Sequence, residues 1–244
     1  MSELWNTSEI WNGLLTNIVT LVLTLLIAWL LYASFGRHSL LKFFGIEKGK
    51  ALRIYVGHVP FPSVPKGFVG FEEINEAKNI EAMFKSVIPG LGEQPGLLKF
   101  LQVADIETKI LPGEVNNPDV SLDHSLISLG SPTANFASSL LETELKNPVK
   151  CDRNTGNIQI PHLPPITDNQ VVVVRICSGG RNYFYVAGKN EPTTAGGARF
   201  MIQIWKSMRK SYGDRASFYY LLQVRNDSRR SVISVANNEL QITG

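Results

Sequence analysis

One run of the sequence constrains the fold more than any other feature: residues 14–35 are 22 positions without a charged side chain. A helix needs about 20 mostly apolar residues to cross the hydrocarbon core of a bilayer. The run therefore predicts a single transmembrane helix, which we place at residues 14–36. Residues 1–13 are then a short extracytoplasmic segment, and a mainly polar region follows the helix.

The charges beside the run predict its orientation. Glu3 and Glu9 precede it, and five basic residues follow it between positions 37 and 53. Basic residues stay on the cytoplasmic side of a span. We therefore expect a single-pass protein of the inner (plasma) membrane, with membrane lipids as partners and its N-terminus outside. A basic juxtamembrane linker, 37–50, then leads to a cytoplasmic domain at residues 51–244. A cleaved signal peptide is the competing interpretation, but it requires a basic start and a shorter apolar stretch.

The predicted span carries polar residues on one face. Asn17, Thr20 and Thr24 are spaced at i, i+3 and i+7, which places them close together around a helix. Polar groups in hydrocarbon seek partners on another helix or line a water-filled path. The alternative is that the threonines bond back to the carbonyls of their own helix. A pore would require a homo-oligomer, such as a tetramer, because one helix encloses no channel.

Charge is unevenly distributed along the remainder of the chain. Residues 71–149 hold 12 acidic and 5 basic residues, whereas residues 150–244 hold 6 acidic and 13 basic residues. This asymmetry favours an anionic partner for the basic part, contact between the two parts in an oligomer, or simply a solvated surface. Cys151 and Cys177 form no CxxC motif, and the four histidines show no ligand spacing, so we expect no metal and no cofactor.

Apolar patterning predicts strands that alternate with helices. We expect strands at 51–57, 125–129, 171–177, 182–187 and 217–225, with further ones near 106–111 and 231–236. Helices are expected at 72–87, 136–145 and 198–210, a short helix is one interpretation of the start of 97–110, and the proline-rich residues 59–66 are expected to form a loop. This order predicts an α/β fold: a three-layer domain with a mostly parallel sheet, made mixed by a hairpin at 171–187, of Rossmann-like or flavodoxin-like type.

Residues 130–135 form the first of two strand-to-helix turns that could hold a ligand. Gly130 allows a sharp turn, Ser131 is a favourable N-cap, and Pro132 is a favourable first helical residue. Thr133 and Asn135 add polar side chains beside free backbone N–H groups, and such a helix start attracts phosphate. The alternative is a capped helix that binds nothing.

The second turn spans residues 187–199 and is rich in glycine and threonine. It contains neither a Walker A motif nor GxGxxG. In an open α/β sheet both turns lie at the carboxyl edge of the strands, where such folds bind ligands, and the end of the first strand at Gly57 and His58 reaches the same edge. The predicted ligand-binding residues are Gly57, His58, Gly130, Ser131, Thr133, Asn135, Gly188, Lys189, Thr193, Thr194 and Arg199.

Signatures of an enzyme are sparse. The sequence contains no GxSxG nucleophile motif, and we assign no catalytic residue. Two alternatives to a ligand-gated membrane protein remain open. One is a membrane-tethered enzyme that acts on a nucleotide or a nucleotide sugar. The other is a scaffold whose α/β domain binds a protein partner.

The order of these motifs resembles a known group of proteins. A strand that ends in Gly-Ser-Pro-x-x-Asn, a later hairpin, a strand that ends in Ala-Gly, and a Thr-Thr-Ala-Gly-Gly-Ala helix start are similar to α/β domains of prokaryotic antiviral systems. Over residues 51–225 the chain resembles the small single-span effectors of Hailong-type defence. The resemblance implies a bacterial, oligomeric, non-enzymatic effector in anti-phage defence, whose pore opens or closes with a bound nucleotide or short oligonucleotide.

Overall fold

The structure is a computed structural model that describes residues 7–46, 52–61, 64–85, 106–110, 120–145, 149–152, 155, 157–225 and 232–240. The chain divides into two compact units, Met1–Ser39 and Leu40–Gly244. The short helix that is one interpretation of the start of 97–110 falls outside the described residues.

The first unit consists of most of helix α1, Thr7–Phe43. Every described side chain from Trp11 to Ile27 is exposed, whereas the side chains of residues 28 and 30–34 lie outside the description. Thr16, Thr20 and Thr24 each donate a 2.8 Å hydrogen bond to the carbonyl four residues earlier, which is the alternative in which the threonines bond to their own helix. Among the described residues, no helix reaches the length and apolarity required to cross a membrane. The predicted span therefore stays a prediction.

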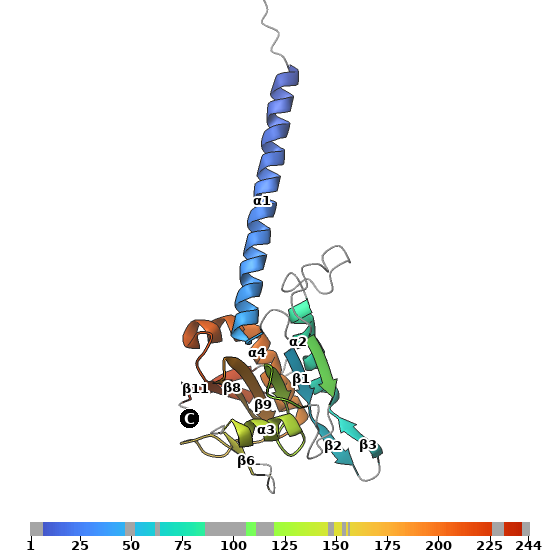
Figure 1. Ribbon diagram of the computed structural model, residues 1–244, viewed down its shortest axis with the longest axis vertical. Coiled ribbons are helices and arrows are strands. Elements are labelled where there is room, and N and C mark those ends of the chain that lie inside the picture. Colours follow the sequence, from blue (N-terminus) through green and yellow to red (C-terminus); the bar gives the residue numbers. More distant parts are fainter. Residues whose placement is uncertain are drawn as a thin grey trace, which may run out of the picture. The chain divides into compact units, whose positions relative to one another are not determined.

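The second unit is built on a seven-stranded mixed sheet with the strand order β11-β10-β8-β9-β5-β1-β4 (Figure 1). The strands β4, β1, β5 and β9 run parallel to one another, and β8, β10 and β11 add antiparallel pairs. Their bounds are β1 Leu52–Val56, β4 Ile106–Ile110, β5 Leu126–Leu129, β8 Gln170–Ser178, β9 Arg181–Gly188, β10 Phe218–Val224 and β11 Val232–Glu239.

Helices cover both faces of this sheet. Side chains of α2 (Phe71–Lys85) and α4 (Glu191–Tyr212) share one apolar core with Ile54, Leu129 and Val186 of the sheet. Helix α3, Phe136–Glu144, contributes Ala137 and Leu141 to a second core on the opposite face. The predicted mixed α/β class and the hairpin between β8 and β9 are therefore confirmed.

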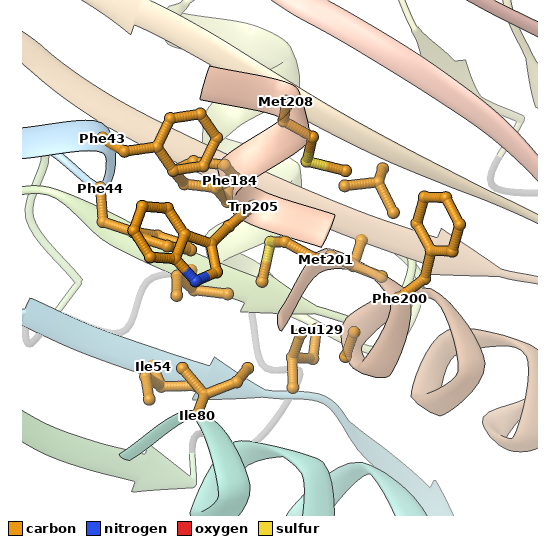
Figure 2. Close-up of a cluster of buried hydrophobic side chains, with 14 of the residues drawn as sticks. Phe43, Phe44, Ile54, Ile80, Leu129, Phe184, Phe200, Met201, Trp205 and Met208 are labelled. Atoms are coloured by element: carbon orange, nitrogen blue, oxygen red, sulfur yellow. The ribbon is translucent and has the colours of Figure 1, made fainter. Parts of the chain in front are cut away.

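The end of α1 is part of the first of these cores. Phe43 and Phe44 are fully buried and lie beside Phe184 and Trp205 (Figure 2). The guanidinium group of Arg175 contacts the rings of both Phe43 and Phe218, 4.7 and 4.6 Å from their centroids. Cation–π contacts of this kind are attractive, and more so when desolvated.

Two hydrogen bonds also hold this segment, which we call the anchor (residues 40–46). Asn182 donates its side-chain amide to the carbonyl of Phe43 at 2.8 Å, and the Ser125 hydroxyl donates to the carbonyl of Gly45 at 2.7 Å. The compact unit thus begins at Leu40, inside the stretch expected to be a linker at 37–50.

The proline-rich stretch at 59–66, which we expected to be a loop, largely forms a small antiparallel ribbon instead. Its strands are β2, His58–Phe61, and β3, Val64–Val69. Pro60 and Pro65 are compatible with this because an isolated two-stranded ribbon has outward edges where no N–H is needed. A second ribbon pairs β6, Lys150–Cys151, with β7, Ile158–Gln159.

Candidate functional site

Three strand ends meet at the carboxyl edge of the parallel half of the sheet. Gly57 follows β1 and donates its N–H to Leu129 of β5 at 3.0 Å, and Gly130 donates to Val186 of β9 at 2.9 Å. A cleft of about 220 Å³ opens beside them. The described residues that line it are Gly57, Gly70, Glu73, Gly130, Ser131, Thr133, Ala134, Gly188, Lys189, Asn190, Glu191 and Thr194.

Glycine is required at two of these strand ends. Gly130 has a φ of +110°, a backbone conformation that side-chain-bearing residues rarely adopt. A Cβ on Gly188 would collide with the Thr193 side chain. The chain thus turns away from both strands at the cleft without a side chain in the space beside it.

The first predicted turn reaches the cleft, and α3 begins at residue 136 as expected, but the predicted cap and first helical residue are wrong. Asn135, rather than Ser131, is the N-cap of α3, and Pro132 lies in the turn before the helix. Because α3 begins at Phe136, the hydroxyls of Ser131 and Thr133 are left at the cleft wall, 2.6 Å apart.

Asn135 does not line the cleft, and its side chain instead holds this turn in place through buried hydrogen bonds. Its side-chain amide is buried and donates to the carbonyls of Tyr55 at 3.1 Å and Leu129 at 2.8 Å, while its oxygen accepts from the N–H of Ala137. A buried amide that is satisfied in this way fixes the ends of β1 and β5 relative to α3. We therefore interpret Asn135 as a positioning residue.

The second predicted turn is much shorter than expected, because α4 begins at Glu191 rather than at residue 198. Asn190 and Thr193 form a reciprocal capping box, and Pro192 occupies the first turn, where proline is favourable. Gly196 and Gly197 lie within the helix. A Cβ on Gly197 would lie 2.6 Å from Val171, so the glycine allows α4 to approach the sheet closely.

This earlier helix start separates the predicted ligand residues. Lys189 and Thr194 line the cleft, whereas Thr193 is buried in the capping box. Arg199 lies two turns into α4 and does not line the cleft: its Nε and Nη2 contact Glu76 of α2 at 2.9 and 2.6 Å. The side chain of His58 lies outside the described residues.

Two carboxyl groups that were not among the predicted ligand-binding residues also line the cleft. Glu73 of α2 is only 8% exposed, and Glu191 of α4 lies near it and accepts the backbone N–H of Glu72. Burial first, and then the charge of Glu191, raise the pKa of Glu73 to about 7, while a hydrogen bond with Thr194 opposes the rise. Glu73 therefore exchanges a proton near neutral pH.

The remaining charge at the cleft is the ammonium of Lys189, which lies 3.4 Å from the exposed carboxylate of Asp168. Exposed ion pairs of this kind are weak, so Lys189 can turn toward a bound anion at little cost. In the described part of the chain, no group of three or more His, Cys, Asp or Glu side chains is placed to hold a metal ion.

Comparison of the chain with models of protein families, with curated proteins and with solved structures gave no match.

Proposed function

We propose that this chain is a membrane effector whose α/β domain binds a nucleotide or short oligonucleotide in the cleft. The single observation that carries the proposal is the convergence of Gly57, Gly130 and Gly188 on one cleft beside the start of α4. Helix starts and glycine-marked strand ends attract phosphate groups. Ser131, Thr133 and Lys189 supply side-chain donors at the cleft.

The strand order supports a sheet of Rossmann-like or flavodoxin-like type. The chain passes from β1 to β4 on one side and returns to β5 on the other, so the direction of winding reverses between β1 and β5. Open α/β sheets bind ligands at such a reversal, outside the carboxyl ends of the strands. Gly57 and Gly130 flank this point.

The membrane part of the proposal is supported by α1. Its described apolar side chains are exposed around the helix, and such a surface requires a lipid or protein environment. Together with the charge distribution, this favours a single-pass protein of the inner membrane with a cytoplasmic α/β domain. In the proposed mechanism the chains oligomerise, and the bound ligand opens or closes a pore during anti-phage defence.

The first test uses the full-length protein in a mild detergent. Its native mass is measured, the protein is then denatured, and released nucleotides are identified by mass spectrometry. We expect a ring-like oligomer, such as a tetramer, that carries a nucleotide or short oligonucleotide. A monomer with nothing bound would contradict both the pore and the ligand.

The same preparation tests the contribution of Lys189. Lys189→Ala should reduce the amount of co-purified nucleotide about tenfold or more, because a hydrogen bond to a charged phosphate is lost. Lys206→Ala, which removes an equal charge from an exposed position of α4, is the matched control. An equal loss in both variants would indicate a general charge effect and would remove Lys189 from the site.

The polar face of α1 tests the pore. Asn17→Leu combined with Thr20→Leu and Thr24→Leu should abolish dye leakage from liposomes while membrane insertion stays intact. The hydroxyls of Thr20 and Thr24 already bond within their own helix. They therefore do not need a partner helix, and this face is available to line a pore. Unchanged leakage would count against a pore lined by these residues.

A membrane-tethered enzyme is the second candidate, and one observation favours it. The cleft holds a carboxyl group whose pKa is raised to about 7 beside a second carboxyl, a combination suited to general acid–base chemistry. In that case, Glu73→Gln should abolish turnover of a nucleotide or nucleotide sugar while binding persists. If the wild-type protein leaves every nucleotide and nucleotide sugar tested chemically unchanged, the enzymatic candidate is rejected.

A further inference from the structure

The side chains that line the cleft favour a polar ligand fragment over an aromatic one. Among the described residues that line the cleft, none is aromatic and none is a large aliphatic residue. A nucleobase is usually held by stacking on an aromatic ring or between apolar walls. The cleft offers backbone, hydroxyls, carboxyls, one amide and one ammonium, so it is suited to a polar ligand fragment without an aromatic ring.

The size of the cleft also favours a fragment of a nucleotide over a whole nucleotide. Its volume of about 220 Å³ is below the roughly 300–1,000 Å³ of pockets that enclose a whole drug-sized molecule. A fragment of a nucleotide fits this volume, and the rest of the molecule must extend outside. The polar fragment of a nucleotide is its sugar and phosphate.

The lining of the cleft carries groups of two kinds. The hydroxyls of Ser131 and Thr133 and the ammonium of Lys189 can donate to phosphate oxygens. The carboxyls of Glu73 and Glu191 also line the cleft. A carboxylate repels phosphate but accepts hydrogen bonds from sugar hydroxyls, the role an acidic residue has in many nucleotide sites.

We propose that the cleft binds the sugar–phosphate part of a nucleotide, with the phosphate at Ser131, Thr133 and Lys189 and a sugar hydroxyl at Glu73, and that the base lies outside. This inference rests on the proposed function and specifies the recognised part of the ligand. Glu73 is then a specificity-determining residue. Its burial and its contact with Thr194 hold the carboxyl in place, and in either protonation state it can pair with a hydroxyl.

Four probes test this assignment by calorimetric titration of the full-length protein in detergent, after any co-purified nucleotide has been removed: AMP, ribose 5-phosphate, adenosine and tetrahydrofurfuryl phosphate. The last probe keeps the ring and phosphate of ribose 5-phosphate but has no hydroxyl. We expect AMP and ribose 5-phosphate to bind with similar affinity, and adenosine not to bind. Tetrahydrofurfuryl phosphate should bind at least about tenfold more weakly, because the hydrogen bonds to the carboxyl are missing.

Variants of Glu73 test whether its carboxyl causes the difference in affinity between ribose 5-phosphate and tetrahydrofurfuryl phosphate. In Glu73→Leu the ratio between ribose 5-phosphate and tetrahydrofurfuryl phosphate should fall toward one, while Glu73→Gln should keep part of it because an amide still pairs with a hydroxyl. Glu144→Gln, at an exposed position of α3 away from the cleft, is the control and should keep the full ratio.

The outcomes separate this inference from the proposed function. Binding of AMP and adenosine without binding of ribose 5-phosphate would overturn the sugar–phosphate assignment and leave a nucleotide site. An unchanged ratio in Glu73→Leu would remove Glu73 from recognition. Binding of ribose 5-phosphate without AMP would overturn the nucleotide function, and failure of all four probes would overturn both.

Discussion

At the scale of single residues, Glu73 is the group whose behaviour depends most on the fold. Its carboxyl is buried beside a second acid, although water would stabilise its charge. The protein tolerates this arrangement because Glu73 can hold a proton near neutral pH. Such a group lowers stability when it is forced to ionise, and groups of this kind gather at functional sites.

The pH dependence of stability follows from the pKa of about 7 in the folded protein and the ordinary value of 4.5. Between these values the folded state keeps a proton that the unfolded state has lost, so the contribution of Glu73 to stability falls as pH rises and then levels off above pH 7. Glu73→Gln should therefore gain about 3 kcal/mol of unfolding free energy relative to wild type between pH 4.5 and pH 8.

Urea titration of the full chain in detergent at these two pH values measures the change. Glu144→Gln, which removes an exposed carboxyl from α3, is the control and should show little change. A pH profile for Glu73→Gln that parallels the wild type would show that this carboxyl ionises in the ordinary range.

At the scale of elements, helix α4 approaches the sheet closely because of Gly197. Alanine is a better helix former by about 1 kcal/mol. Even so, Gly197→Ala should destabilise the protein by about 1–3 kcal/mol, because the new methyl group would lie 2.6 Å from Val171 and 2.9 Å from Val186.

Thermal unfolding followed by circular dichroism provides the measurement for this substitution. Ser207→Ala, at an exposed position of the same helix, is the control and should be neutral or slightly stabilising. A stabilising effect of Gly197→Ala would mean that α4 can move away from the sheet without loss.

Most elements of the domain could be predicted from the sequence because their signals are local. The apolar runs of β5 and β8, the Gly-Gly turn of the hairpin and the spacing of α2 all report on neighbouring residues. The start of α4 was missed because two consecutive glycines indicate a loop, whereas the reason for them is contact with Val171 and Val224 on distant strands.

The cleft was predictable only in part for the same reason. Glycines at strand ends indicated Gly57, Gly130 and Gly188 without any long-range information. Glu73, in the first turn of α2, was not predicted, because no sequence signal shows that it lies near Glu191, 118 residues later in the chain. Placing Arg199 correctly would have required the true start of α4.

At the scale of the whole molecule, the anchor and the cleft occupy opposite ends of the same strands. Ser125 and Asn182, which bond the anchor, lie at the amino ends of β5 and β9. Gly130 and Gly188, which line the cleft, lie at the carboxyl ends. Two short strands therefore connect the residues that follow the predicted membrane span with the proposed ligand site.

This arrangement makes Phe43 part of the stability of the α/β domain. Phe43→Ala should cost about 3–5 kcal/mol, because it removes a fully buried ring and leaves the Arg175 guanidinium with one aromatic neighbour. Phe35→Ala is the control: Phe35 is 72% exposed on the same helix, and its loss should not affect the domain. Urea titration in detergent distinguishes the two, and equal midpoints would show that the anchor is not part of the fold.

The anchor has a mechanical consequence. A pulling force applied to the amino end of the chain enters the α/β domain at Leu40, so it acts on the insertion of Phe43 and Phe44 before it acts on the strands. The hydrogen bonds from Ser125 and Asn182 then carry the load directly into β5 and β9, whose far ends form the cleft. The force at which the anchor is extracted would measure how firmly Phe43, Phe44 and these hydrogen bonds hold the chain to β5 and β9.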